Sequence, residues 1–189
     1  NPYAAIELAQ AWARRGARPE LGIPLPVPAT VRALVAERLD RLSPEARGLV
    51  LLVSLAGRPS LASIGAIVDG VGPVLAEAEA AGALAEDGDR VRPAHPLVAM
   101  VAESTATDAE RRMMHERLAA ATDDLETRAR HLAALPDAGP DVGGAIEDGA
   151  AAAMARGAPT AAADLLDVAI ARTHPTARID LVRRRVAGA

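Results

Sequence analysis

Cysteine, lysine and phenylalanine are absent from this chain of 189 residues, which also has a single tryptophan, Trp12, and a single tyrosine, Tyr3. Without cysteine the chain cannot form disulfides, thiolate metal sites or a cysteine nucleophile. Without lysine it cannot form a phosphate-binding P-loop, because that loop uses a lysine to reach the β- and γ-phosphates. No run of 18 apolar residues occurs, so we predict no membrane-spanning helix and no membrane partner. The absence of cysteine and the absence of a membrane-spanning helix are typical of a reducing, cytoplasmic compartment, which we therefore expect.

Small and aliphatic side chains make up much of what is present. Half of the residues are apolar, and with so few aromatics the core must be built from Leu, Val, Ile and Ala. Alanine and leucine are strong helix formers, so this composition predicts an all-α fold. The formal net charge of −4 argues against a large nucleic-acid interface, which is usually basic.

The first 27 residues are predicted to be the end of a helical lid domain followed by a linker. Asn1 and Pro2 are favoured at helix starts, and Gly16 is a favoured stop. Residues 17–28 carry four prolines and therefore predict an extended linker. Because the chain opens at Asn1 inside a helix pattern and without a Met, we expect it to be an interior piece of a larger protein.

Residues 28–105 are predicted to form helices followed by a small β-hairpin. Apolar side chains recur at helical spacing, and Pro or Ser stands at several helix starts. These helices are expected at about 28–42, 44–57, 61–68 and 73–81. Two short strands should then flank the turn at Asp87-Gly88, before helix resumes near Leu97. This order predicts a winged helix whose wing is the hairpin; an α+β module of another kind is the alternative.

Residues 106–189 are predicted to form a helical repeat array. Thr107 and Glu110 have the capping-box spacing that starts a helix. Later helices are expected at about 125–135, at 142–156 and 159–172 as an antiparallel pair joined at Gly157, and from near 175. Helices of this length with alanine at packing positions are typical of tetratricopeptide-like repeats, although the repeat of about 34 residues is matched only loosely.

His95 is the candidate binding residue. It follows the hairpin and stands at the start of a helix, where free N–H groups and the helix dipole favour anions. Its imidazole could therefore donate a hydrogen bond to a phosphate; a capping or buried structural histidine is the alternative. His115, His131 and His174 are predicted to be structural or surface residues, since no two histidines have the spacing of metal ligands. We therefore predict no metal site.

Catalytic and DNA-reading patterns are missing from the sequence. No serine stands in a G-x-S-x-G pattern, and acidic pairs such as Glu77 with Glu79 are interpreted as solvated helix faces. We therefore predict that the chain is not an enzyme. The presumed recognition helix at 73–81 has acids but no Arg, Asn or Gln to read base edges, which argues against insertion into a DNA groove.

Several motifs, taken in order, resemble one family. The segment from Asn1-Pro2 to Glu7-Leu8 is similar to the "N-P-hydrophobic … E-L" motif of STAND-type signalling ATPases. The later motifs resemble bacterial LuxR-type regulators of the large ATP-binding class, and together they span nearly the whole chain. They are "LP.P…VRALV..RLDRLSP..R.LL" at 25–52, "R-V-R-F-x-H-P-L-V" at 90–98, "R-R-x-x-H-x-x-L-A" at 111–119 and "A-R-G-A-x-x-A-A-x-L-L-x-x-A" in 155–169. Pro93 stands where the family has an aromatic residue, which predicts an early end of the second strand.

The resemblance implies a role for two matched residues. Pro2 matches a proline near the adenine in related ATPases, and His95 matches a sensor histidine that contacts the β-phosphate of bound ADP. The chain itself would hold no cofactor; ATP or ADP would bind an upstream nucleotide-binding domain in cis, and the winged helix would act as a nucleotide-dependent latch. A protein or small-molecule inducer would bind the repeats. A stand-alone winged-helix DNA-binding regulator and a helical protein-interaction scaffold are the alternatives.

Overall fold

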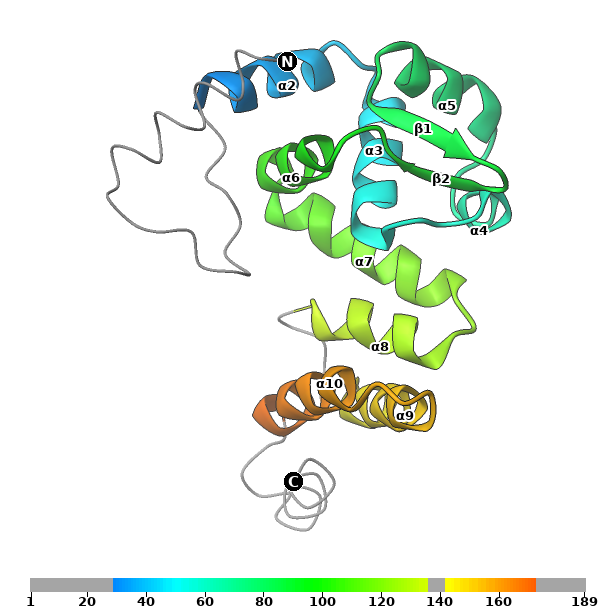
Figure 1. Ribbon diagram of the computed structural model, residues 1–189, viewed down its shortest axis with the longest axis vertical. Helices are drawn as coiled ribbons and strands as arrows, with labels where there is room; N and C mark the ends of the chain where they lie inside the picture. Colours follow the sequence, from blue (N-terminus) through cyan, green and yellow to red (C-terminus); the bar gives the residue numbers. More distant parts are fainter. Residues whose placement is uncertain (1–28, 136–141, 173–189) are drawn as a thin grey trace.

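The computed structural model describes residues 29–135 and 142–172, which are mostly helical with one small antiparallel sheet (Figure 1). This confirms the predicted fold class of helices with a β-hairpin. The predicted lid and linker at 1–27, with Pro2, lie outside the described residues, and so does the predicted last helix from near residue 175.

Within the described residues, four helices precede the sheet, and local signals explain most of their ends. They are α2 (Ala29–Asp40), α3 (Pro44–Ala56), α4 (Leu61–Gly65) and α5 (Val71–Ala80). The Ser43 hydroxyl accepts a hydrogen bond from the Ala46 N–H at the start of α3, and Gly57 ends that helix with φ 83°. Helix α3 is buried on most sides, as its apolar sequence predicts. Helix α5 begins two residues before the predicted Pro73, because Gly70 turns the chain with φ 64°.

The sheet consists of β1 (Leu84–Asp87) and β2 (Arg90–Pro93), joined by a turn in which Gly88 has φ 66°. The predicted early end of the second strand is wrong, because Pro93 pairs with Leu84. A proline is tolerated there, since the next N–H, that of Ala94, continues the pairing by donating to the Ala83 carbonyl at 2.9 Å.

The segment before α4 lies along the other edge of β2. Ser60 forms an isolated antiparallel bridge with Arg90. The Val91 N–H donates to the Pro59 carbonyl at 3.0 Å, and the Leu61 N–H donates to the Asp89 carbonyl at 2.8 Å. The hairpin is therefore held on both sides of β2, which compensates for its short strands.

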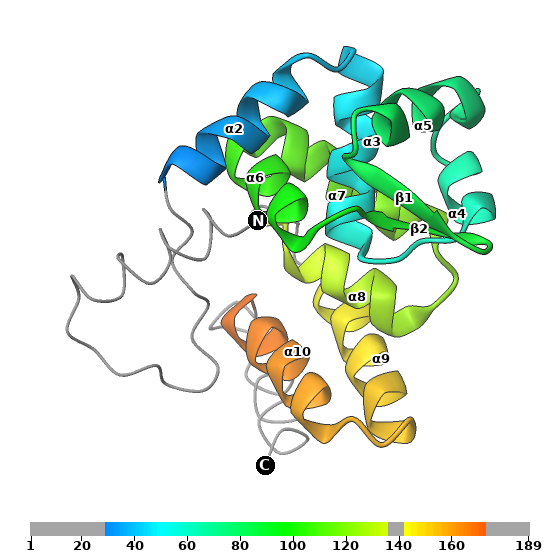
Figure 2. The same cartoon turned by 45° about the horizontal axis from the view of Figure 1, so that its top comes forward.

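In the part of the chain that the structure describes, five helices follow the sheet: α6 (Pro96–Thr105), α7 (Asp108–Ala121), α8 (Leu125–Ala133), α9 (Val142–Ala155) and α10 (Pro159–Arg172). The predicted capping box is confirmed, because Thr107 and Glu110 each accept a hydrogen bond from the other's backbone N–H. The predicted helix pair is also confirmed: α9 and α10 pack side by side around a turn at Gly157, where φ is 81° (Figures 1 and 2).

Two clusters of buried apolar side chains hold the described residues together. The first extends from Leu39 to Leu118 and is centred on α3. The second lies between α8, α9 and α10 and extends from Ala129 to Ala169. Helices α7 and α8 connect the two clusters, so the junction between these helices lies between the two cores (Figure 2).

Candidate functional site

His95 lies at the start of α6, directly after β2, and is exposed. Its backbone is extended, with φ −147° and ψ 146°, and its Nδ1 atom accepts a hydrogen bond from the Leu97 N–H at 3.1 Å. The imidazole therefore caps the helix. This geometry matches one part of the alternative interpretation, capping, and excludes the other, burial in the core.

The capping bond determines which ring nitrogen of His95 can bind a ligand. Because Nδ1 accepts a hydrogen bond, the proton of the neutral ring must reside on Nε2. Nε2 makes no hydrogen bond to any described residue. The side chain thus offers an Nε2–H donor to solvent, on a ring whose orientation is held by Leu97.

The start of α6 is less suited to anions than the sequence predicts. Pro96 has no N–H, the Leu97 N–H is taken by the imidazole, and the Val98 N–H donates to the His95 carbonyl at 2.9 Å. Pro96, Leu97 and Val98 therefore offer no free backbone donor, which reduces the contribution expected from free N–H groups. A phosphate at this end of the helix would be bound by the imidazole itself.

Of the two binding residues predicted from the sequence, only His95 lies within the described residues, and it offers one exposed donor, the Nε2–H. No family model, curated protein or solved structure matches this chain. We therefore infer its function from its own residues.

Across 29–135 and 142–172, no group of three His, Asp or Glu side chains is arranged to hold a metal ion. Among the helices in those ranges, none has both the length and the apolar character to cross a bilayer.

A pair of histidines at the α7–α8 junction was missed by sequence reasoning. The Nδ1 atoms of His115 and His131 lie 3.1 Å apart, with ring centroids separated by 5.3 Å. One signal could have revealed this pair: the two positions lie at equal distances from Asp123, in the turn between the helices. Two helices folded back on that turn would bring both rings to the same level.

Burial dominates the electrostatics of this pair. His131 is only 5% exposed, and burial, together with His115 and Arg130, lowers its pKa to about 4. Burial and the nearby Arg111 also lower the pKa of His115. Both rings are therefore neutral near pH 7, and one Nδ1–H donates to the other Nδ1.

Two acids interpreted as solvated faces have structural partners instead. The Glu77 carboxylate accepts hydrogen bonds from the N–H and the hydroxyl of Ser43, both at 2.7 Å, and these bonds lower the pKa of Glu77. Glu79 accepts from the Glu86 N–H at 3.1 Å. Glu79 is nevertheless exposed, so the solvated-face interpretation is wrong only for Glu77, which is half-buried. Both partners lie on other elements, which only the folded chain brings to α5.

Several arginines cap helix ends rather than forming a phosphate-binding surface. Arg111 donates to the Glu103 and Ala106 carbonyls at 2.8 and 2.5 Å, at the end of α6. Arg172 donates to the Leu132 and Ala133 carbonyls at 2.9 and 2.6 Å, at the end of α8. Cations are favoured at these carbonyl ends. Their hydrogen-bond donors are thus directed at the protein itself.

Proposed function

We propose that this chain is the regulatory segment of an ATP-dependent transcriptional regulator of LuxR type, in which His95 contacts the nucleotide bound by an upstream domain. The observation that carries the proposal is the exposed imidazole behind β2, whose Nε2–H is unused by the described residues while Nδ1 is held by Leu97. A donor held in one orientation binds a phosphate oxygen at a smaller entropic cost than a freely rotating side chain.

A winged helix is the second part of this proposal. Helices α3, α4 and α5 are followed by the β1–β2 hairpin, and an isolated bridge joins Ser60, between α3 and α4, to Arg90 of β2. This order supports assigning the hairpin as the wing and α5 as the helix in the recognition position. The helices from α7 to α10 would then begin a tetratricopeptide-like array.

In this proposal the winged helix works as a latch. With ADP bound to the upstream domain, a β-phosphate oxygen accepts the His95 Nε2–H and holds the segment closed. Exchange for ATP, or an inducer on the helical array, releases it. Such a switch requires that the nucleotides differ in affinity for the closed and open states, because a ligand that binds both states equally shifts nothing.

The decisive experiment measures ADP dissociation from the full-length protein carrying His95→Asn. Asparagine is a favoured N-cap, so it should keep α6 intact while removing the Nε2–H donor. We expect ADP to dissociate at least about tenfold faster, as for the loss of one hydrogen bond to a charged group. An unchanged dissociation rate in a variant of normal melting temperature would remove His95 from the mechanism. A reading frame upstream of Asn1 that encodes no P-loop would overturn the whole proposal.

DNA binding by the chain itself is the first competing function. Helix α5 carries Glu77 and Glu79 and no basic residue, so it would meet DNA phosphates with carboxylates. We expect no binding of this chain to duplex DNA in a fluorescence-anisotropy titration at low salt. Tight binding that weakens steeply with salt would favour a stand-alone DNA-binding regulator.

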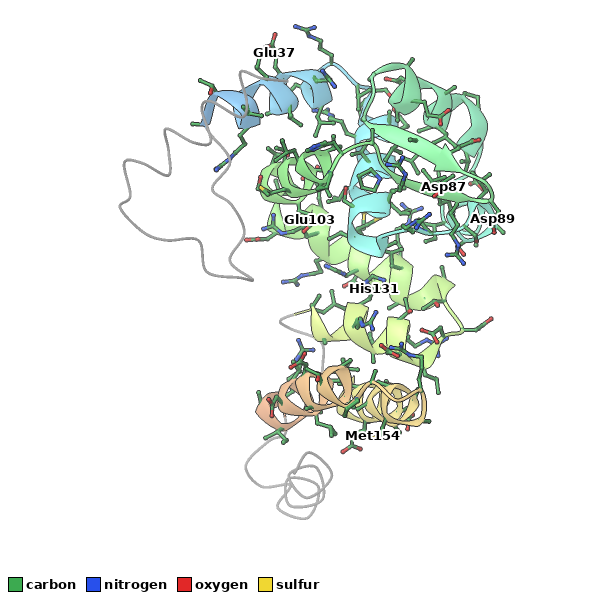
Figure 3. All side chains as sticks on the ribbon, in the orientation of Figure 1. Glu37, Asp87, Asp89, Glu103, His131 and Met154 are labelled. Carbon is green, nitrogen blue, oxygen red and sulfur yellow. The ribbon has the colours of Figure 1, made fainter. Side chains whose placement is uncertain are left out.

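A helical interaction scaffold is the second competing function. An apolar groove of about 370 Å³ lies between α9 and α10, and it includes Met154, which is 50% exposed (Figure 3). Such a groove is a reasonable place for an inducer or a partner helix. The scaffold differs from the latch in one respect: it predicts that the sequence upstream of Asn1 encodes no P-loop.

A further inference from the structure

A cavity of about 250 Å³ lies where α7 and α8 meet the side of the molecule that carries α4 and β2. Its polar lining comes from both sides of that junction: Arg58, Ser60, Ser63 and Arg90 from one, and Thr122, Thr127 and His131 from the other. His95 does not line this cavity, so the cavity is separate from the site of the proposed latch.

The positive charge of the cavity wall that no ion pair neutralises comes from Arg90. Two arginines line the cavity, and no Asp or Glu does. Arg58 forms an ion pair with Asp87, whereas Arg90 donates one guanidinium N–H to the Arg58 carbonyl at 2.9 Å and makes no other side-chain hydrogen bond to the described residues. A guanidinium has five N–H donors, so Arg90 keeps most of its donors for a ligand.

The hydroxyls of Ser60 and Ser63 add a neutral donor. Their oxygens lie 2.8 Å apart, and the Ser63 N–H donates to the Ser60 oxygen at 3.1 Å. One hydroxyl proton is used between the two oxygens, and the other has no partner among the described residues. That proton can be donated into the cavity.

His131 provides the observation that points to a ligand. The His131 ring lies on α8 (Figure 3) and faces His115 of α7. Its residue is only 5% exposed. Its Nδ1 is occupied by His115, but its Nε2 has no partner among the described residues. Every fully buried polar side-chain atom of those residues has a partner, so Nε2 keeps some exposure, and His131 is one of the residues that line the cavity.

We propose that this cavity binds a small oxyanion of the phosphate class, held by the Arg90 guanidinium, the free serine hydroxyl and the His131 Nε2–H. Guanidinium and N–H donors without a competing carboxylate are the groups that bind phosphate oxygens best. The volume lies below the range of about 300–1,000 Å³ typical of drug-sized ligands, which favours inorganic phosphate or a small phosphorylated molecule over a nucleotide.

Binding would select one proton arrangement of the histidine pair. An anion needs the proton of His131 on Nε2, so His131 Nδ1 must accept while His115 Nδ1–H donates. The anion would also favour protonation of His131, which His115, Arg130 and burial now oppose. Because the ligand contacts β2 and α8 together, it would tie the sheet-bearing part of the molecule to the helical array.

The test is an NMR titration of the whole chain with sodium phosphate and, separately, with glycerol phosphate, at constant ionic strength set by chloride. We expect saturable shifts of the His131 ring ¹⁵N signals with either probe, and the tighter of the two identifies the source of the phosphate group. Shifts that rise linearly with both probes, or that equal those caused by chloride, would overturn the proposal.

The matched variants are Arg90→Gln and Arg92→Gln, two exposed positions of the same strand, of which only Arg90 lines the cavity. We expect Arg90→Gln to weaken phosphate binding about tenfold, and Arg92→Gln to change it by less than about twofold. Ser63→Ala should weaken it less than Arg90→Gln, because it removes a neutral donor. Equal effects of the two arginine variants would show a general charge effect and would sink the assigned site.

Discussion

Gly149 of α9 faces Ala129 of α8 so closely that a β-carbon added at Gly149 would lie 2.1 Å from the Ala129 β-carbon and 2.8 Å from the Leu125 carbonyl oxygen. Both positions are buried. Alanine and glycine at this crossing allow the two helix backbones to approach, and the second apolar cluster forms around them. The close crossing of α8 and α9 therefore depends on the absence of a methyl group at position 149.

Gly149→Ala should destabilise the chain, although alanine is the better helix former. The gain in helix propensity is about 1 kcal/mol, whereas overpacking of a close contact costs about 1–3 kcal/mol or more. Urea unfolding should therefore show a lower midpoint. Gly144→Ala, in the same helix and with nothing within 4 Å of the added carbon, is the control and should be neutral or stabilising by at most about 1 kcal/mol. Equal effects of the two substitutions would contradict the close crossing.

Acid should weaken the fold through His131. Its pKa is about 4 in the folded protein against an ordinary value of about 6.5, so the unfolded chain binds the proton more readily. Stability should be complete above about pH 6.5 and should fall as the pH drops from there to about 4, by about 3 kcal/mol at most. The groups facing this pair are Arg111 and Arg130, which both oppose protonation.

Urea unfolding at several pH values between 4 and 7 checks this pH dependence. His131→Gln keeps a polar side chain but cannot titrate, so the loss of stability over that range should be smaller in the variant. An identical pH dependence in both proteins would show that other groups are responsible.

Ser43→Ala should cost about 1–2 kcal/mol of stability, which is typical of a lost N-cap. The Ser43 hydroxyl accepts from the Ala46 N–H at 3.2 Å and donates to Glu77 on α5, so it supports two helices. The pKa of Glu77 should rise in the variant, because one of the two bonds that lower it is lost. Ser104→Ala removes only a hydroxyl bond to the Val101 carbonyl in its own helix, and it should change stability by less than about 0.5 kcal/mol. Thermal unfolding of both variants measures the difference.

Glu126 and Arg156 should be energetically coupled. Glu126 is a buried carboxylate on α8, and it accepts hydrogen bonds from the Arg156 Nε and Nη2 atoms at 2.9 and 2.7 Å. Arg156→Met should lower the urea midpoint of the natural protein, because it leaves a buried charge with Arg130 as its remaining partner. In a Glu126→Leu background the same change should have little effect. Additive effects in this double-mutant cycle would show that the pair contributes nothing to stability.

Local signals made much of the fold predictable. The Ser43-Pro44 start of α3, the Thr107–Glu110 capping box and the Asp87-Gly88 turn each act within a few residues, so their outcome can be seen in the sequence. The position of His95 behind the hairpin was predictable for the same reason. The capping bond from the Leu97 N–H to His95, which leaves Nε2 free, could not be predicted from the sequence, because it depends on the side-chain rotamer.

By itself, the sequence determined that the described residues are helical with one hairpin, that the chain has no cysteine or lysine, and which histidine follows the hairpin. The tertiary structure alone decided the His115–His131 contact, the Ser43–Glu77 link and the cavity beside Arg90. Periodicity and capping act between residues a few positions apart, whereas these contacts join residues separated by 16 positions or more, and their geometry depends on how whole helices pack.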